Sequence, residues 1–306
     1  PVIAVFTAHE PHDADKVCKF IDFRDDGYEV RAHVGLVEGD SAKDKKQHLL
    51  DVWNGRAEAP SKFCVESTVK PEDEWLHSFY YFNDEIPTDA DFEKAIGDYL
   101  TFEFSMVMQN REYLFEGDIN KYIGEQGESV DIPTLNEKEW HKFAAFGENG
   151  LFEIATTSSS IDGIRLIDGA NKVIPYVTRT DANNGIARFV CQDNLSYGSD
   201  AAACITVGLD TQTAFWQPHE FVTGQNIQVI SGDKLNYYLA QFSIPLFKSQ
   251  MKAKFNWGGN GATLGRMKKL ELMLPVNDCG EPDYEYMEQY AKNLILRKYR
   301  QYLSFL

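Results

Sequence analysis

The sequence predicts an α+β protein, in which an α+β first half precedes a β-rich second half that ends in a long helix. Apolar residues recur at helical spacing after Ser41 and again after Thr88. Six short apolar runs, separated by polar and glycine-rich clusters, follow between residues 151 and 230. Residues 282–303 then have the spacing of an amphipathic helix, acidic near its start and basic near its end.

The composition is that of a folded, water-soluble protein. The 306 residues are 43% hydrophobic and 25% charged, which excludes wholesale disorder and provides enough chain for a sizeable core. The sequence has neither a membrane-length apolar run nor a signal-peptide pattern, so we expect a cytoplasmic protein that does not enter membranes. Five widely spaced cysteines favour reduced thiols. Because the chain begins at Pro1 inside an apolar run, we expect a fragment of a longer protein.

The first half is expected to alternate strands and helices. Ser41 with Asp44 three residues later resembles a capping box, and Gly55 stands where that helix would end. Thr88 with Asp91 begins a stronger helix in the same way. Strands are predicted at residues 2–6, 28–36, 63–69 and 78–82.

A polar, glycine-rich stretch over residues 120–135 predicts a boundary between two regions, 1–135 and 136–306. In the second region a helix is predicted with its cap near Ser231 or Asp233. The terminal helix is entered through Pro282. The predicted strands are LFEIATT, VIPYVTR, GIARFV, ACITVGL, TAFWQP and IQVI.

The net charge of −17 originates in the first half. Residues 1–140 hold 31 acidic and 14 basic side chains, whereas residues 141–306 hold 16 of each. Such an acidic half cannot lie along DNA without repulsion, so it should face away from any nucleic acid. The stretch from Lys248 to Lys269 contains six basic residues and no acidic one, which predicts a local basic face.

The sequence predicts neither a catalytic nor a metal site. It lacks the GxxxxGKS/T, HExxH, GxSxG and CxxC patterns. If the chain retained nuclease or methylase chemistry, the carboxylates of Glu72, Asp73 and Glu74 would be the candidates. Only Lys70 lies close to them in sequence, whereas metal-dependent cleavage needs a carboxylate cluster with a nearby lysine.

Several blocks of the second half resemble a known family. They are PYVTRTDANNG, ACITVGLDTQTAFWQPHEFVTGQNIQVI, GRMKKLELMLPV and the terminal PDYEYMEQYAKNLILRKY. In this order they resemble the target recognition domain of restriction-modification specificity subunits, which also occurs fused to adenine methyltransferases. The resemblance covers roughly residues 140–306. It implies a module that binds double-stranded DNA from one side and reads base edges with its loops. The terminal helix would dock to a methyltransferase domain or subunit, or to a second recognition domain.

The first half resembles the tail that follows the catalytic domain in some type I-like adenine-N6 methyltransferases. The blocks concerned are VIAVFTAHEPHD, IDFRDDGYEVRAHVG and DEWLHSFYYFNDEIPTDADFEKAIGDYLTFEF. The chain lacks the family's catalytic signature, an Asn or Asp followed by Pro-Pro and an aromatic residue, and it lacks a glycine-rich cofactor motif. The resemblance therefore implies that this chain is non-catalytic by itself. S-adenosylmethionine would bind to a methyltransferase part upstream of Pro1.

The resemblance and the side-chain chemistry together select candidate DNA contacts. Arginine suits guanine, asparagine and glutamine suit adenine, and threonine can meet the thymine methyl group. Two polar loops supply such side chains, of which Arg179 is the strongest candidate: Arg179, Thr180, Asn183 and Asn184, then Gln217, His219, Thr223, Gln225 and Asn226. Candidates around the glycine-rich loop, chiefly for phosphate contacts, are Lys252, Lys254, Asn260, Arg266 and Lys268.

Structural roles compete with these assignments. The NNG sequence is a turn signal, so Asn183 and Asn184 could serve only to adopt positive φ. The basic stretch could be an ordinary solvated face. Two other functions stay open at this point, namely a protein-interaction module that docks its acidic half on a basic partner, and a fragment that retains methylase or nuclease activity.

Overall fold

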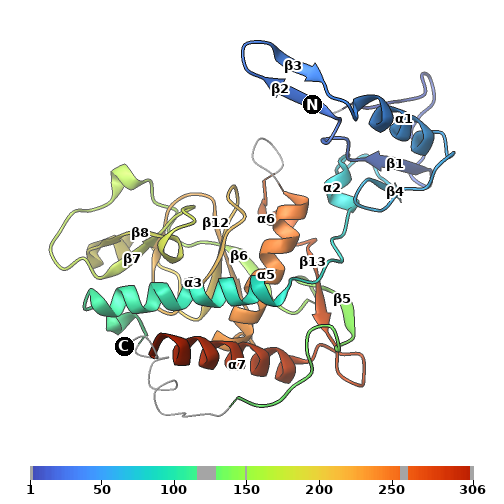
Figure 1. The fold of residues 1–306 in the computed structure, drawn as a ribbon. Coiled ribbons are helices and arrows are strands. Elements are labelled where there is room, and N and C mark those ends of the chain that lie inside the picture. Colours follow the sequence, from blue (N-terminus) through green and yellow to red (C-terminus); the bar gives the residue numbers. More distant parts are fainter. Residues whose placement is uncertain (1–2, 116–128, 149, 256–260, 304–306) are drawn as a thin grey trace. The chain divides into compact units, whose positions relative to one another are not determined.

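A computed structural model describes residues 3–115, 129–148, 150–255 and 261–303. The chain forms two compact units, residues 1–83 and 84–306 (Figure 1). Each unit combines helices with β-sheets, so the predicted α+β class is confirmed. Among the described residues, no helix is long and apolar enough to cross a membrane.

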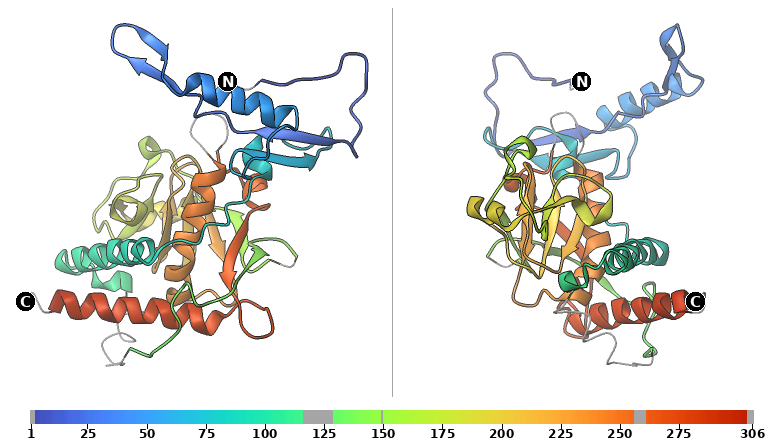
Figure 2. Two further views of the ribbon diagram at one scale, coloured as in Figure 1. Left: turned by 45° about the vertical axis from the view of Figure 1, so that its right-hand side comes forward. Right: turned by 90° about the vertical axis from the view of Figure 1, so that its left-hand side faces the viewer.

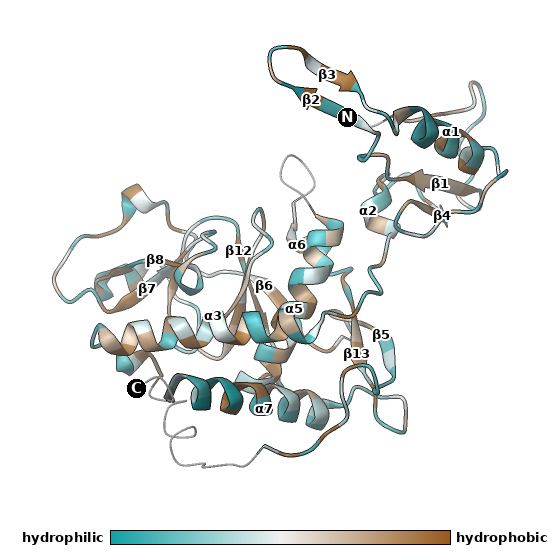
Figure 3. Ribbon diagram, viewed as in Figure 1, coloured by the Kyte–Doolittle hydropathy of each residue, from teal (hydrophilic) through white to brown (hydrophobic). Residues whose placement is uncertain are grey.

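The first unit is organised around the antiparallel pair β1 (Val17–Ile21) and β4 (Cys64–Thr68). Helix α1 (Ala42–Trp53) begins after Ser41 as predicted, although the Ser41 side chain makes no capping hydrogen bond. Few side chains of α1 are buried, and Figure 3 shows it as largely hydrophilic. This unit therefore has a small core.

Of the strands predicted in the first unit, two are absent and one is divided into two strands. The predicted strand at residues 28–36 is divided between β2 (Tyr28–Arg31) and β3 (Gly35–Glu38), which pair as a hairpin. His33 and Gly35 adopt φ of 63° and 91°, and the chain reverses there. Its apolar side chains are exposed, with Val30 83% accessible. The apolar alternation therefore does not mark a buried face.

The other two exceptions flank the β1–β4 pair in sequence. Residues 3–6 form no strand, and Ile3, Val5 and Phe6 are exposed, because no described strand pairs with them. Residues 78–82 contribute to the short helix α2 (His77–Tyr80) instead of a strand. The Tyr80 ring stacks on Phe20, with ring centroids 4.3 Å apart, so aromatic packing decides this segment.

Helix α3 (Asp89–Met108) belongs to the second unit. Its capping box is present as predicted: Thr88 Oγ1 accepts from the Asp91 backbone N–H, and the Asp91 carboxylate accepts from the Thr88 N–H. The predicted apolar face of the helix is buried. The chain thus passes from one compact unit to the other between residues 83 and 84, and the division into 1–135 and 136–306 stays a prediction.

Helices α5 (Tyr237–Lys254) and α7 (Tyr284–Leu303) pack with α3, and Figures 1 and 2 show α3 and α7 side by side. Phe92, Phe242 and Tyr290 contribute one ring from each helix, with centroids 4.8 to 5.6 Å apart. The side chain that caps α5 is Asn236, which accepts from the Leu239 N–H, and not Ser231 or Asp233.

In the β-rich part of the second unit, the described residues form three sheets, and all six predicted strands are present. The four-stranded sheet has the order β10-β9-β12-β6, a three-stranded sheet has the order β11-β7-β8, and β13 pairs with β5. The strands are β5 (Trp140–Ala144), β6 (Glu153–Thr156), β7 (Ile174–Val177), β8 (Ile186–Val190), β9 (Cys204–Gly208), β10 (Ala214–Gln217), β11 (Val222–Thr223), β12 (Ile227–Ser231) and β13 (Glu271–Pro275).

Candidate nucleic-acid interface

Strand pairing brings three loops to one edge of the second unit. Strands β7 and β11 are parallel, with Thr223 opposite Val177, so the residues that follow both strands emerge at the same end. Strand β12 starts at this end, because Ile227 lies opposite Gly208, the last residue of β9. We call this surface the loop edge, and it comprises residues 178–185, 209–213 and 224–226.

Backbone hydrogen bonds tie these loops together. The Leu209 N–H donates to the Asn226 carbonyl at 3.0 Å, and the Gly224 N–H donates to the Val177 carbonyl at 2.8 Å. The Ala262 N–H donates to the Leu209 carbonyl at 3.1 Å, which brings residues 261 and 262 beside the loop edge. The loops are therefore held as one surface by groups that do not depend on side-chain identity.

Arg179 and Asn226, predicted in separate loops, meet at one carboxylate. Arg179 Nη1 lies 2.5 Å from Asp210 Oδ2, and Asn226 Nδ2 donates to the same oxygen at 3.3 Å. The side chains of Arg179 and Asp210 are 46% and 29% accessible. A guanidinium, a carboxamide and a carboxylate therefore stand together at the surface.

The turn that carries Asp210 has a conformation that few residues allow. Gln212 in this turn adopts a left-handed φ of 51°, and Asn226 in the neighbouring loop one of 63°. A Cβ on Gly208 would come within 2.6 Å of Thr211 Oγ1, so only glycine fits without moving the turn. Gln212 Nε2 donates to the Asp210 carbonyl at 2.8 Å and closes the turn.

The paired asparagines have the structural role that competed with DNA contact. Asn183 and Asn184 both adopt positive φ, as the turn signal predicts. Asn184 is buried, and its Nδ2 donates to the Trp216 carbonyl at 2.7 Å. Asn183 is exposed, although its Nδ2 donates to the Ile186 carbonyl at 3.1 Å. Only Asn183 of the two is accessible to a ligand.

The remaining predicted readers divide between surface and interior. Gln225 is exposed and Thr180 is half-buried, both on the loop edge. Gln217 and Thr223 are buried: Gln217 Nε2 donates to Thr206 Oγ1 at 2.9 Å, and the Thr223 hydroxyl bonds to Thr157 Oγ1 at 2.8 Å. Their polar groups are satisfied inside the protein.

His219 does not join the loop edge. Strands β9 and β10 are antiparallel, with Gln217 opposite Cys204, so His219 follows the end of β10 that is remote from the 209–213 turn. Its ring lies edge-on to Tyr113, with centroids 5.7 Å apart. The second predicted set of readers is therefore split between two ends of the sheet.

The predicted phosphate contacts differ in exposure. Lys252 and Lys268 are exposed, and Arg266 is half-buried with Nη1 donating to the Gly261 carbonyl at 3.0 Å. Lys254 is buried, and burial lowers its pKa, opposed by the nearby Glu271. Asn260 lies outside the described residues.

The carboxylates considered for cleavage chemistry lie in a turn of the first unit. Asp73 Oδ2 accepts from the Lys70 N–H at 3.1 Å, which closes the turn. Within the described residues, no group of three His, Cys, Asp or Glu side chains is arranged to hold a metal ion. This turn has an evident structural role.

Most of the second unit matches a known protein family. The family described as the type I restriction modification DNA specificity domain matches residues 141–302, which is more than half of the chain. The chain belongs to this family.

Two curated proteins of Heyndrickxia coagulans are similar to this specificity-domain chain. The type II restriction enzyme and methyltransferase RM.BcgI is 47% identical over 117 residues, which cover 38% of this chain and 18% of that protein. The specificity subunit S.BcgI of a type II restriction enzyme is 29% identical over 209 residues, which cover 66% of this chain and 55% of that subunit. The chain thus spans only about half of the specificity subunit and under a fifth of the larger protein.

Two solved structures are distantly similar to the specificity-domain chain. The type I restriction-modification S subunit from M. genitalium aligns with a TM-score of 0.37 at 12% identity, covering 79% of this chain and 72% of that one. The HsdS subunit from Thermoanaerobacter tengcongensis aligns with a TM-score of 0.36 at 10% identity, covering 79% of this chain and 54% of that one.

Asp210 is the loop-edge residue that the sequence does not reveal. Acidic side chains are repelled by DNA, so side-chain chemistry alone selects hydrogen-bond donors and cations as candidate contacts. The sequence does place Asp210 in GLDTQT, two residues after a buried apolar strand. Loops in such positions commonly carry the side chains of functional sites.

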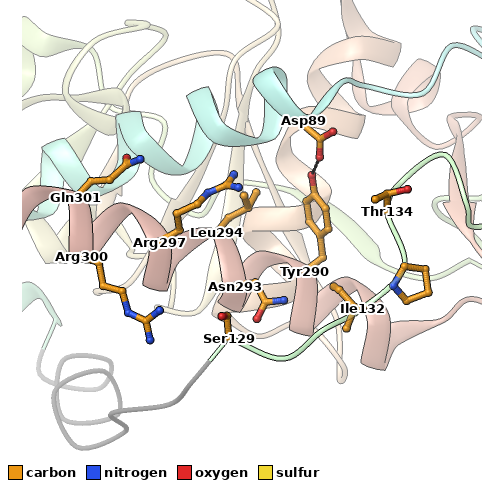
Figure 4. Close-up of a pocket in the computed structure, with 11 residues that line it drawn as sticks. Asp89, Ser129, Ile132, Thr134, Tyr290, Asn293, Leu294, Arg297, Arg300 and Gln301 are labelled. Atoms are coloured by element: carbon orange, nitrogen blue, oxygen red, sulfur yellow. Dashed lines mark hydrogen bonds between the residues drawn. The ribbon is translucent and has the colours of Figure 1, made fainter.

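A separate pocket of about 590 Å³ lies beside α7, lined in part by Asp89, Tyr290, Arg297 and Arg300 (Figure 4). The Tyr290 hydroxyl donates to Asp89 Oδ1 at 2.5 Å. Burial and this carboxylate raise the pKa of Tyr290, so the tyrosine stays neutral at physiological pH. The pocket lies on the helical side of the 84–306 unit and is lined by residues both inside and outside the matched range 141–302.

Proposed function

We propose that this chain is a sequence-specific DNA-binding module of a restriction-modification system and that it reads its target through the loop edge. The observation that carries the proposal is the surface group of Arg179, Asp210 and Asn226, in a chain of the DNA specificity family. Arginine can donate two hydrogen bonds to guanine, and asparagine can both donate to and accept from adenine. The group therefore has the chemistry that base reading requires.

The exposed and half-buried members of the predicted set complete the reading surface. Thr180, Asn183 and Gln225 stand on the same loops and provide hydroxyl and carboxamide groups. Asn184, Gln217 and Thr223 would support these loops from the interior, because their polar groups are already used there. The proposal leaves His219 outside the reading surface.

Backbone contacts would come from the basic stretch. Lys252, Lys268 and Arg266 are accessible and need no strict geometry to neutralise phosphates. Asn260 stays in the proposal on the strength of its sequence position alone. Lys254 would have a structural role and not contact phosphate, because its side chain is buried and its pKa is lowered.

Catalysis would belong to an associated methyltransferase part, which would bind S-adenosylmethionine. The family match and the methyltransferase named among the relatives support this division. Calorimetric titration of the chain with S-adenosylmethionine should give no saturable heat. Binding with a submillimolar Kd would contradict the proposal.

The terminal helix is the proposed docking element for that part, or for a second recognition domain. One face of α7 packs on α3 and α5, where Arg297 pairs with Glu93 of α3, while Glu285 and Arg300 are exposed. The outward face and the pocket beside it offer charged groups to a partner.

The test is selection of bound duplexes from a random-sequence pool, followed by affinity measurement. One short motif is expected, and Arg179→Ala should weaken binding to it roughly 10-fold or more. Lys172→Ala is the matched control, because Lys172 lies two residues before β7 and Arg179 two residues after it. Failure to recover any motif, with no binding at low salt, would overturn the proposal.

A further inference from the structure

We propose that Asp210 is a positioning residue that orients Arg179 to read one guanine instead of binding a phosphate. This inference rests on the proposed function and adds to it the base class that the loop edge recognises. It assigns a role to a carboxylate on a surface that must approach a polyanion. Without such a role the carboxylate would oppose binding.

The geometry of the ion pair leaves the reading edge of the arginine available. Asp210 Oδ2 contacts Nη1 of Arg179, so Nε and Nη2 remain for a second partner. The guanidinium is more exposed than the carboxylate that holds it, at 46% against 29%. Arg179 is therefore held at Nη1, while its side chain as a whole stays 46% accessible.

Asp210 is itself fixed, which a positioning residue requires. Asn226 Nδ2 binds the same Oδ2 atom, and Gln212 Nε2 holds the Asp210 carbonyl. Gly261 lies beside the carboxylate, because a Cβ there would be in ordinary van der Waals contact with Asp210 Oδ1, at 3.6 Å. Asn226 thus restrains the carboxylate and Gln212 restrains its backbone, so Asp210 can restrain Arg179 in turn.

Fixing the arginine favours guanine over phosphate for two reasons. A bidentate contact with guanine O6 and N7 needs a defined guanidinium plane, whereas a phosphate accepts a cation from many directions. The carboxylate also offsets the arginine charge and so weakens its attraction to the DNA backbone. The target site should therefore contain a guanine opposite Arg179.

A purely structural role for the ion pair is the competing explanation. An exposed pair contributes little to stability, and backbone hydrogen bonds already hold the turn. The two explanations differ in what happens to base preference when the pair is broken. A structural role predicts no change at any single base position.

The experiment compares Asp210→Asn with the matched control Asp181→Asn in the complete chain. Asp181 is exposed on the same loop edge, and no ion pair to it is found among the described residues. Both variants remove one negative charge. We expect Asp210→Asn to lose about 10-fold or more of the preference for G·C at one position of the selected motif, while the other positions keep theirs.

Salt dependence gives a second readout. A released Arg179 should bind phosphate, so the slope of log K against log salt on a non-specific duplex should steepen by roughly 0.9 for Asp210→Asn beyond the change in Asp181→Asn. In an Arg179→Ala background, Asp210→Asn should have no further effect on base preference. Arg179→Lys keeps the charge without the planar fork and should also lose the preference.

The outcomes separate this inference from the proposed function. If the wild-type chain selects a motif and Asp210→Asn leaves every position of it unchanged, the role of Asp210 is overturned and the proposed function stands. An unchanged motif in Arg179→Lys would have the same meaning and does not depend on the folding of the Asp210 variant. If the wild-type chain selects no motif, both are overturned.

Discussion

At the scale of single residues, Lys248 is a charge in an unfavourable place. Lys248 is in α5, and its Nζ lies 5.0 Å from the centroid of the Phe215 ring in β10. Burial lowers the pKa of this lysine to about 8. Asp98 opposes this shift, whereas Lys94 and Lys252 add to it. Folding therefore costs free energy below pH 8, where this half-buried amine must carry its charge.

This placement predicts how stability changes with pH. The pKa of Lys248 is about 8 in the folded chain, whereas the ordinary lysine value of 10.5 applies to the unfolded chain. The unfolded chain therefore binds more protons between pH 8 and pH 10.5. The free energy of unfolding should then gain a contribution that rises with pH across this window. Lys248→Met should stabilise the protein at pH 7 by roughly 1–3 kcal/mol and remove that contribution.

Denaturant unfolding at pH 7, 8 and 9.5 would measure both effects. Lys43→Met is the control, because Lys43 is an exposed helix lysine that does not contribute to the Lys248 shift, and its replacement should change stability by no more than about 0.5 kcal/mol. Equal stability of Lys248→Met and wild type at pH 7 would contradict the assigned cost of burial.

At the same scale, the sequence predicts candidate side chains but not which of them meet. Arg179 and Asn226 could be selected by side-chain chemistry, but their meeting at Asp210 depends on the pairing of β9 with β12. Burial of Gln217 and Thr223 likewise follows from sheet packing. Side-chain type predicts which chemistry is available, whereas tertiary structure decides which groups reach the surface.

At the scale of elements, local signals predicted helices well where capping and apolar spacing agreed. Thr88 and Asp91 form the expected capping box before a helix whose apolar face is buried. Alternation alone was weaker, because residues 28–36 satisfy it and yet form an exposed hairpin. Positive φ at His33 and Gly35 overrides the periodicity there.

The capping box gives an element-scale prediction. Thr88→Ala removes the hydroxyl that accepts from the Asp91 N–H and should lower the free energy of unfolding by about 1 kcal/mol. Thr101→Ala is the matched control, because Thr101 lies exposed within α3 and its hydroxyl only bonds back to the Gly97 carbonyl. If chemical denaturation shows an equal loss in both variants, the cap does not stabilise α3.

At the scale of the whole molecule, the compact units divide the chain differently from its charge. The acidic excess extends to residue 140, but α3 is part of the core of the 84–306 unit through Phe92, Ile96 and Leu100. Charge reports what a surface repels, whereas the core reports which residues fold together. The sequence revealed the first and not the second.

Truncation tests this division. A fragment of residues 84–306 retains the whole continuous core and the loop edge, so it should unfold cooperatively and bind the selected duplex with wild-type affinity. A fragment of residues 136–306 loses α3 and exposes Phe242 and Tyr290, and it should not fold cooperatively. Calorimetry of both fragments measures the difference. A cooperative transition in the shorter fragment would contradict the role of α3.

Hydrogen–deuterium exchange, with and without the selected duplex, tests the central claim most directly. If the loop edge reads DNA, the duplex should slow exchange of backbone amides in residues 179–183, 210–212 and 225–226, in the complete chain. Exchange in the β2–β3 hairpin should stay unchanged. Protection confined to residues 1–83 or to α7, with none at the loop edge, would contradict the account.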